Sequence, residues 1–498
     1  MSTELSHGYP VFSAGSPAVS LVAPDGVTTR DRVAVLLTST GAEVAIAFGL
    51  LAAIFCAFLV RLTSVVISDM DEGTYLYAGK LVADGLAPYR DFLLAHPPLA
   101  VYLAAGWVKL MGADVMAARM ANLTFVLAST VPLYLTVRHL ARGRVPGLLA
   151  IVTYMTGNLL LANMGRTIKL EPLMNAFLIA AFAIYVLRPN QVSWRVLFGV
   201  LVGAAVLVKL VAVIPVGLIV LGDLIWSRPG RRFLVSWAAA ALGAAIVLGP
   251  AALYLLGQPG FLDAVLFSQL QRGGLPLDLR WHYLAQDFTR YPPIPLALLA
   301  SAWFMLRARD SRLRVAALVS LAGSTSLVLF FKTFFTYYLV LVMPWLAIVF
   351  VIACCGMLRR FSSHWRSLVV SLTLIMGVLV PIGYDEVYYR TGTMHVSSPA
   401  NIIPLLQSGN GYIYSMYPLF ALWSGRPAYP WYYTVDALIP RLTGRLTSAD
   451  FIQAFSGSQA VVLYDGELND YAEASAYLVN QFERTYHDGY FALWVRPS

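Results

Sequence analysis

Charged residues are scarce in this chain of 498 residues, since only 12% are Asp, Glu, Lys or Arg. Soluble globular proteins carry about 25% charged residues. Hydrophobic residues make up 59% of the chain, and apolar runs of about 20 residues recur along it, each long enough to cross ~30 Å of hydrocarbon. The shortage of charge therefore excludes a soluble enzyme and predicts a polytopic helical membrane protein.

Cysteine is almost absent as well. Cys56, Cys354 and Cys355 all fall inside apolar runs, which excludes a disulfide framework and a thiolate metal site. The start of the chain is rich in Ser, Gly and Pro and lacks an apolar core after a basic stretch, so we expect no cleavable signal peptide. Residues 1–42 are predicted to be a disordered cytoplasmic tail.

The hydropathy predicts about eleven membrane spans within a transmembrane module of residues 43–383. They lie at residues 43–67, 114–137, 145–163, 173–188, 194–208, 210–227, 233–256, 292–306, 314–331, 335–356 and 367–383. We divide the apolar run 194–227 because Lys209 would otherwise sit at mid-membrane, at a cost of about 2.5–3.5 kcal/mol or more.

The net charge of +9 comes from basic residues in short turns between the spans. The turns "RHLARGR", "RPNQVSWR", "SRPGRRF", "RARDSRLR" and "LRRFSSHWR" all lie on one side, which the positive-inside rule assigns to the cytoplasm. This pattern argues against a nucleic-acid partner. It predicts a multi-pass protein of the cell membrane with a cytoplasmic N-terminus and with loops 68–113 and 257–291 outside.

Two segments outside the spans have predicted structure. The stretch "LAVYLAAGWVKLMG" is too short to cross the membrane and reads as an interfacial helix, begun by Pro97–Pro98 and ended at Gly112. Residues 384–498 alternate short apolar strands with helical patches, which predicts a small extracytoplasmic α/β domain.

The first outer loop gathers acids in the stretch "SDMDEGTYLYAGK". Ser68 with Asp71 could simply begin a helix, because acids are favourable at its positive end. Alternatively, Asp71 and Glu72 point about 100° apart on a helix, so that one carboxylate could accept the proton of an attacking hydroxyl while the other faces elsewhere. The second interpretation describes a sugar transferase.

Such a transferase needs cations for a leaving phosphate, and the outer turns supply them. The candidates are Arg90, His96, Arg119, Arg166, Lys169, Arg272, Arg280 and Lys332. Each also has an ordinary explanation; Arg119, for example, could snorkel to the interface. Glu171 is either a helix-start acid or, with Glu72, a carboxylate ligand for Mg²⁺ or Mn²⁺.

The stretch "DEGTYLYAGKLVADGLAPYRDFLLAHPPLAVYLAAGWVKLMGADVMAAR" resembles the first outer loop of GT-C glycosyltransferases, in the protein-O-mannosyltransferase and aminoarabinose-transferase branch. The likeness continues in "RTIKLEPLMNAFLIA", "GVLVGAAVLVKLVAVIPV" and "FKTFFTYYLVLVMPWLAI", and covers roughly residues 45–350. It implies an all-α GT-C bundle of bacterial or archaeal type. The chain departs from oligosaccharyltransferases in lacking a "WWDYG" motif, and from eukaryotic mannosyltransferases in lacking a large insertion in 257–291.

The resemblance also implies a reaction. A sugar would move from a polyprenyl-phosphate donor to an extracytoplasmic glycan, lipid or protein, with inversion at the anomeric carbon. By position Asp71 would be the general base, and Glu72 would orient the acceptor or a metal shared with Glu171. The resemblance also assigns donor-phosphate binding to His96, Arg119 and Lys332. From the outer turns we add Lys169 and Arg90 to these cations, and Tyr75, Tyr337 and Tyr338 as residues that line the cavity, although Tyr337 and Tyr338 also fit the aromatic belt of a membrane span.

The chief alternative is a transporter or flippase of a lipid-linked or small polar substrate. Transporters place polar residues near the bilayer midplane, and Lys209 fits that pattern. The near-absence of acids inside the spans and of internal repeats argues against it. A non-catalytic scaffold is a third possibility, in which the outer charges would share no cavity. The transferase predicts one cavity lined by Asp71, Glu72, His96, Arg119, Glu171 and Lys332.

Overall fold

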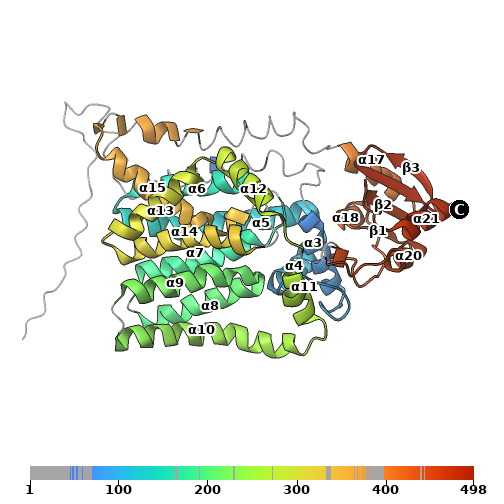
Figure 1. Cartoon of the computed structure of the whole chain (residues 1–498), viewed down its shortest axis with the longest axis horizontal. Coiled ribbons are helices and arrows are strands. Elements are labelled where there is room, and N and C mark those ends of the chain that lie inside the picture. Colours follow the sequence, from blue (N-terminus) through green and yellow to red (C-terminus); the bar gives the residue numbers. More distant parts are fainter. Residues whose placement is uncertain are drawn as a thin grey trace, which may run out of the picture. The chain divides into compact units, whose positions relative to one another are not determined.

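The computed structural model describes most of the chain after residue 69 (Figure 1). The described ranges are residues 70–162, 167–189, 191–227, 230–271, 273–331, 338–363, 397–437, 440–441 and 443–497, with isolated positions within 45–59 and 365–383. The predicted disordered tail and most of the first predicted span lie outside these ranges. Ten positions of the last predicted span, 367–383, are described, and all ten are helical.

Apolar helices form the body of the described chain. Five of them are long and apolar enough to cross a membrane: α5 (Val115–Ala141), α6 (Arg144–Ala162), α10 (Arg231–Leu256), α14 (Ser311–Phe330), and η3 with α15 (Tyr338–Val342, Met343–Leu358). Shorter apolar helices are α7 (Glu171–Leu187), α8 (Val192–Val208), η1 with α9 (Leu210–Ala212, Val213–Trp226) and α13 (Pro293–Arg307). Each falls on a predicted span, so this is a multi-pass membrane protein.

Local chemistry explains where these helices begin and end. Asp114 caps α5 by accepting a 2.6 Å hydrogen bond from the Ala117 amide, and Arg142 ends that helix in the left-handed conformation. Prolines occupy the first turn of α7, α13 and α15, where the missing N–H would have no partner in any case. Sequence signals of this kind act over a few residues, so they can be recognised in the sequence without knowledge of the fold.

Helices α8 and α10 approach each other through glycine (Figure 1). A Cβ on Gly199 would lie 1.9 Å from the carbonyl oxygen of Ala240, and a Cβ on Gly243 would lie 2.0 Å from that of Val196. Backbones of membrane helices pack closely where small residues meet, because dispersion rather than the hydrophobic effect drives their association. These two glycines therefore fix the spacing of α8 and α10.

The predicted break at Lys209 is present. Helix α8 ends at Val208, Lys209 is extended (φ −155°, ψ 126°), and the 3₁₀ turn η1 leads into α9. The backbone interruption places the lysine at a junction of two helices instead of inside a continuous one.

The first loop contains two helices, α3 (Met70–Ala83) and α4 (Leu99–Met111). Helix α4 follows Pro98 and ends just before Gly112, as the sequence predicted, and the φ of 77° at Gly112 suits glycine. The proposed cap residue Ser68 lies outside the described residues. In the loop 257–291, the π-helical turn η2 (Asp263–Phe267) and α11 (Ser268–Gln271) precede α12 (Leu277–Arg290).

The C-terminal part holds a four-stranded sheet in the order β1-β2-β4-β3. Strands β1 (Ile413–Ser415) and β2 (Ala460–Tyr464) are parallel, and β4 (Phe491–Val495) pairs antiparallel with both β2 and β3 (Glu483–His487). Among the described residues of this part, the helices are α17 (Ser397–Gln407), α18 (Leu419–Ser424), α20 (Ser448–Ser456) and α21 (Ala472–Gln481). A capping box of Thr447 and Asp450 begins α20.

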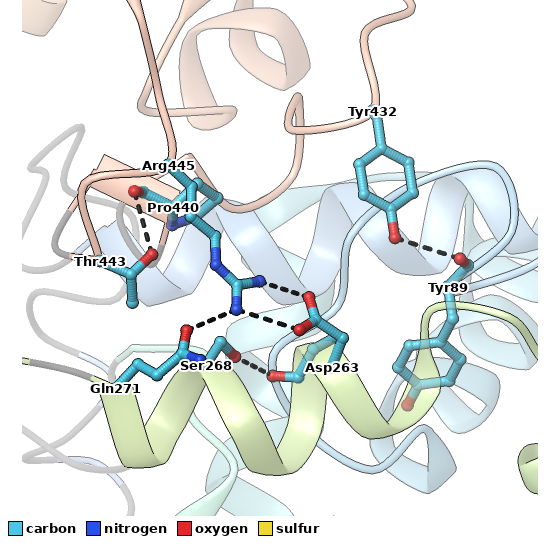
Figure 2. A network of polar contacts seen from close by, with 9 residues as sticks. Tyr89, Asp263, Ser268, Gln271, Tyr432, Pro440, Thr443 and Arg445 are labelled. Carbon is cyan, nitrogen blue, oxygen red and sulfur yellow. Dashed lines mark hydrogen bonds and ion pairs between the residues drawn. The ribbon is translucent and has the colours of Figure 1, made fainter.

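The C-terminal part packs on the loops of the helical body. Figure 2 shows Arg445 between Asp263 and Gln271, and the Tyr432 hydroxyl donating to the Tyr89 carbonyl at 3.1 Å. One apolar core cluster also includes residues of α3, η2 and the sheet. Gly73 permits a close approach, because a Cβ there would lie 2.6 Å from the Leu419 amide nitrogen. Helix α18 thereby packs against the first turn of α3, which carries the acids.

Candidate functional site

The acids of the first loop lie in the first turn of α3 and differ in exposure. Glu72 is fully buried, whereas Asp71 is half-buried. Acids are favourable here because unpaired amide groups make a helix N-terminus positive. Of the two adjacent carboxylates, Asp71 is the more accessible.

Glu72 forms a bidentate ion pair with Arg119 of α5. The Arg119 Nε and Nη2 atoms donate to Glu72 Oε1 and Oε2 at 2.6 and 2.8 Å, and only 5% of the Arg119 side chain is exposed. The Ile168 amide donates to the same carboxylate at 3.3 Å. A buried charge requires such compensation, so this pair joins α3, α5 and the segment before α7 into one unit.

A second buried pair joins Glu171, at the start of α7, to Lys209. The Lys209 Nζ donates to Glu171 Oε1 at 2.5 Å, with side-chain exposures of 12% and 2%. Lys169 also interacts electrostatically with Glu171, and Lys209 with Asp71. The Lys209 Nζ lies 5.9 Å from the centre of the Tyr338 ring. Glu171 and Tyr338 therefore lie beside Lys209, while Lys169 acts on Glu171.

His96 and Tyr75 lie together on the first loop. Their ring centres are 6.0 Å apart, and the Tyr89 hydroxyl donates to the His96 carbonyl at 2.7 Å, which fixes the backbone before the two prolines. Tyr75 is buried and His96 is half-buried. The imidazole thus stands on a constrained turn.

Arg90 occupies a different environment from the other candidates. Its side chain is 60% exposed and forms a bidentate pair with Asp91, at 2.9 and 2.8 Å. The hydrogen bond from Arg90 lowers the pKa of Asp91 to about 2. Asp91 thus holds the Arg90 guanidinium at the surface. The Arg280 guanidinium is held in another way, by donating to the backbone carbonyls of Leu275 and Leu329.

Several predicted residues fall outside the described residues: Lys332, Tyr337, Arg166 and Arg272. The expectation of one shared cavity therefore stays a prediction. Within the described ranges no group of three or more His, Cys, Asp or Glu side chains could hold a metal ion. Glu72 and Glu171 face different cations, so the described residues do not fit the divalent site that their carboxylates suggested.

The sequence missed the role of Lys209 as the partner of Glu171. From the sequence alone, Lys209 indicates an interruption of an apolar run and supports a transporter. A signal existed, since an intramembrane lysine requires an acid at a similar depth. Glu171 begins an apolar span and was the matching candidate.

Comparisons with known proteins agree with this architecture. Residues 95–255 match the family described as dolichyl-phosphate-mannose-protein mannosyltransferase. A comparison with curated protein sequences found no significant match.

Two crystal structures of ArnT from Cupriavidus metallidurans have a similar fold. The apo form is 15% identical, with a TM-score of 0.63, and the match covers 91% of this chain and 98% of that one. The form bound to undecaprenyl phosphate is 12% identical, with a TM-score of 0.61, and the match covers 95% of this chain and 99% of that one.

The apolar helical body and the similarity to ArnT over most of both chains show that this chain is a multi-pass membrane protein with an ArnT-like fold, in which residues 95–255 match the mannosyltransferase family model.

Proposed function

We propose that this protein transfers a sugar from a polyprenyl-phosphate donor to an extracytoplasmic glycan, lipid or protein, with Asp71 as the general base. The family match supports a transferase. A similar fold has been solved bound to undecaprenyl phosphate, which supports a lipid-linked donor for this chain. A polyprenyl tail stays in the bilayer, so its phosphate must be met at the membrane surface.

The accessibility of Asp71 beside the fully buried Glu72 carries the assignment of roles. A general base must reach within about 3 Å of the acceptor hydroxyl, which a half-buried side chain can do on binding. Glu72, held by Arg119 and the Ile168 amide, positions the helix turn from which Asp71 projects. Glu72 is thus a positioning residue in this proposal.

The reaction is a single displacement. The acceptor oxygen bonds to the anomeric carbon while the bond from that carbon to the phosphate oxygen breaks, and the acceptor proton passes to the Asp71 carboxylate. Negative charge grows on the leaving phosphate, and it would be stabilised by the cations Lys169, Lys209 and Lys332 and by a hydrogen bond from the His96 ring. Inversion at the anomeric carbon follows from attack on the face opposite the phosphate.

Asp71→Asn tests the proposal directly. Purified wild type and variant would be assayed for transfer from a panel of undecaprenyl-phosphate-linked sugars to cell-envelope extracts. Loss of general-base catalysis should lower the transfer rate by at least about 10²-fold. Asp84→Asn is the matched control, because Asp84 follows the same helix but is exposed and pairs with Lys80. Full transfer by Asp71→Asn would reject Asp71 as the base.

A transporter is the second candidate, and the broken helix at Lys209 favours it. Transporters often bind substrate where a membrane helix is interrupted. Uptake of a lipid-linked or small polar substrate into proteoliposomes without cleavage of any donor would support transport; donor cleavage coupled to acceptor labelling would support transfer. Mass spectrometry of envelope glycans and glycoproteins after gene deletion would identify the sugar and the acceptor.

A further inference from the structure

A cavity of about 860 Å³ lies where α5, α13 and α15 end. Arg119 stands in the first turns of α5 and Arg142 follows its last residue, so the two are about 35 Å apart at 1.5 Å per residue. That is about one bilayer thickness. The cavity is therefore remote from the candidate site, at the end that the loop charges assign to the cytoplasm.

The walls of this cavity are apolar and accessible from the side. Ala300, Phe304 and Phe350 line it, together with Leu296 and Trp303, which are 53% and 60% exposed. Exposed apolar side chains on a membrane helix face lipid. The cavity therefore offers a hydrocarbon chain a path inward from the bilayer.

The rim of the cavity is strongly basic. It carries five arginines and a single acid: Arg142, Arg307, Arg309, Arg359, Arg360 and Asp310. The Asp310 carboxylate already accepts a hydrogen bond from the Arg312 amide at 2.9 Å, as the N-cap of α14. An apolar cavity with a surplus of cations at its mouth matches a molecule that has an anionic head and an apolar tail.

Two of the five arginines at the rim already have contacts within the chain. Arg359 donates to the Ala141 carbonyl at 3.2 Å, and the Arg307 guanidinium lies 5.7 Å from the centre of the Trp303 ring. Across the described part of the chain, the guanidinium groups of Arg142, Arg309 and Arg360 have no hydrogen-bond or ion-pair partner. These three cations remain available to an anion.

The cations at this end of the helices are arginines and not lysines, which favours phosphate as the ligand. The chain has five lysines, Lys80, Lys109, Lys169, Lys209 and Lys332, and none lies in the basic turns at this end. The positive-inside rule is satisfied by either residue type. Arginine differs in presenting a planar fork that binds phosphate oxygens in pairs.

We propose that this cavity binds an anionic membrane phospholipid, with its phosphate among Arg142, Arg309 and Arg360 and one acyl chain against α13 and α15. Basic pockets between membrane helices on the cytoplasmic side bind lipid headgroups in this way. The site is independent of the proposed transfer reaction.

Native mass spectrometry of the purified full chain tests the proposal. Phosphatidylglycerol and phosphatidylcholine with identical acyl chains would be titrated onto wild type and variants. Wild type should prefer phosphatidylglycerol by about tenfold or more. Replacing two arginines with R309Q/R360Q should weaken its binding by about thirtyfold, which at tenfold per 1.4 kcal/mol is the roughly 2 kcal/mol expected for two arginines near an anionic headgroup.

Two further variants separate this site from general surface charge. R231Q/R232Q removes two arginines at the start of α10, on the same face but outside the cavity, and should change the binding by less than about threefold. Ala300→Trp fills the cavity without changing its charge and should also weaken binding. Equal binding of the two lipids, equal losses in both double variants, unchanged binding by Ala300→Trp, or displacement of the lipid by inorganic phosphate would each overturn the proposal.

Discussion

The Glu72–Arg119 pair gives a sharp test of how the candidate site is held. Both side chains are almost completely buried and joined by two hydrogen bonds of 2.6 and 2.8 Å. Replacing one partner leaves the other charge without compensation in a site closed to water, which costs about 3–5 kcal/mol. Glu72→Gln and Arg119→Gln should therefore each destabilise the protein strongly.

The double variant should be more stable than either single variant. With both charges removed, no uncompensated ion remains, and the side-chain amide oxygen introduced by Glu72→Gln can still accept the hydrogen bond from the Ile168 amide. Side chains in direct contact typically show a coupling free energy of about 0.5–3 kcal/mol, and a bidentate buried pair belongs at the upper end. The predicted order of unfolding midpoints is wild type, then the double variant, then the two single variants.

Thermal unfolding followed by tryptophan fluorescence, in one detergent and at one scan rate, measures this order without any substrate. Transfer activity of the folded fraction would be measured in parallel. Suppose that Arg119→Gln unfolds at the wild-type temperature but fails to transfer sugar. Arg119 would then act on the donor phosphate, and the structural role assigned to the pair would be refuted.

Two further variants test features away from this pair. Burial raises the pKa of Glu467 to about 7, above the ordinary 4.5, so the folded chain keeps its proton between those values while the unfolded chain loses it; stability should fall by roughly 2–3 kcal/mol as pH rises through that window. In denaturation experiments at pH 5 and pH 8, Glu467→Gln should lose most of this difference in stability. If the variant shows the same difference between the two pH values as the wild type, the assignment to Glu467 is contradicted. Gly243→Ala should lower the unfolding midpoint through overpacking of about 1–3 kcal/mol against Val196, whereas Gly249→Ala, with open space around it, should not; equal effects would contradict the packing role.

The sequence predicted the helical body because its signals are local. The run expected to span 114–137 forms α5 at Val115–Ala141, and the short helix expected between Pro98 and Gly112 forms α4. Hydrophobic length, proline at a helix start and glycine beyond a helix end depend on a few neighbouring residues, not on the fold.

The sequence also selected residues that the structure brings together, but it did not predict how they pair. Glu72 and Arg119 were assigned separate roles, yet they are partners across 47 positions of the chain. Glu171 was matched with Glu72 around a metal, whereas its partner is Lys209, 38 positions away. Residue type indicates that a buried charge requires a partner, but not which partner it has.

The sequence by itself determined that this chain lies in a membrane, roughly where its described apolar helices begin and end, and which charged residues are costly enough to require an explanation. Only the tertiary structure decided that these charges form two buried ion pairs, that Asp71 is more accessible than Glu72, and that five arginines surround one apolar cavity. The physical reason is that hydropathy acts along the chain, whereas charge compensation acts through space between segments that only packing brings together.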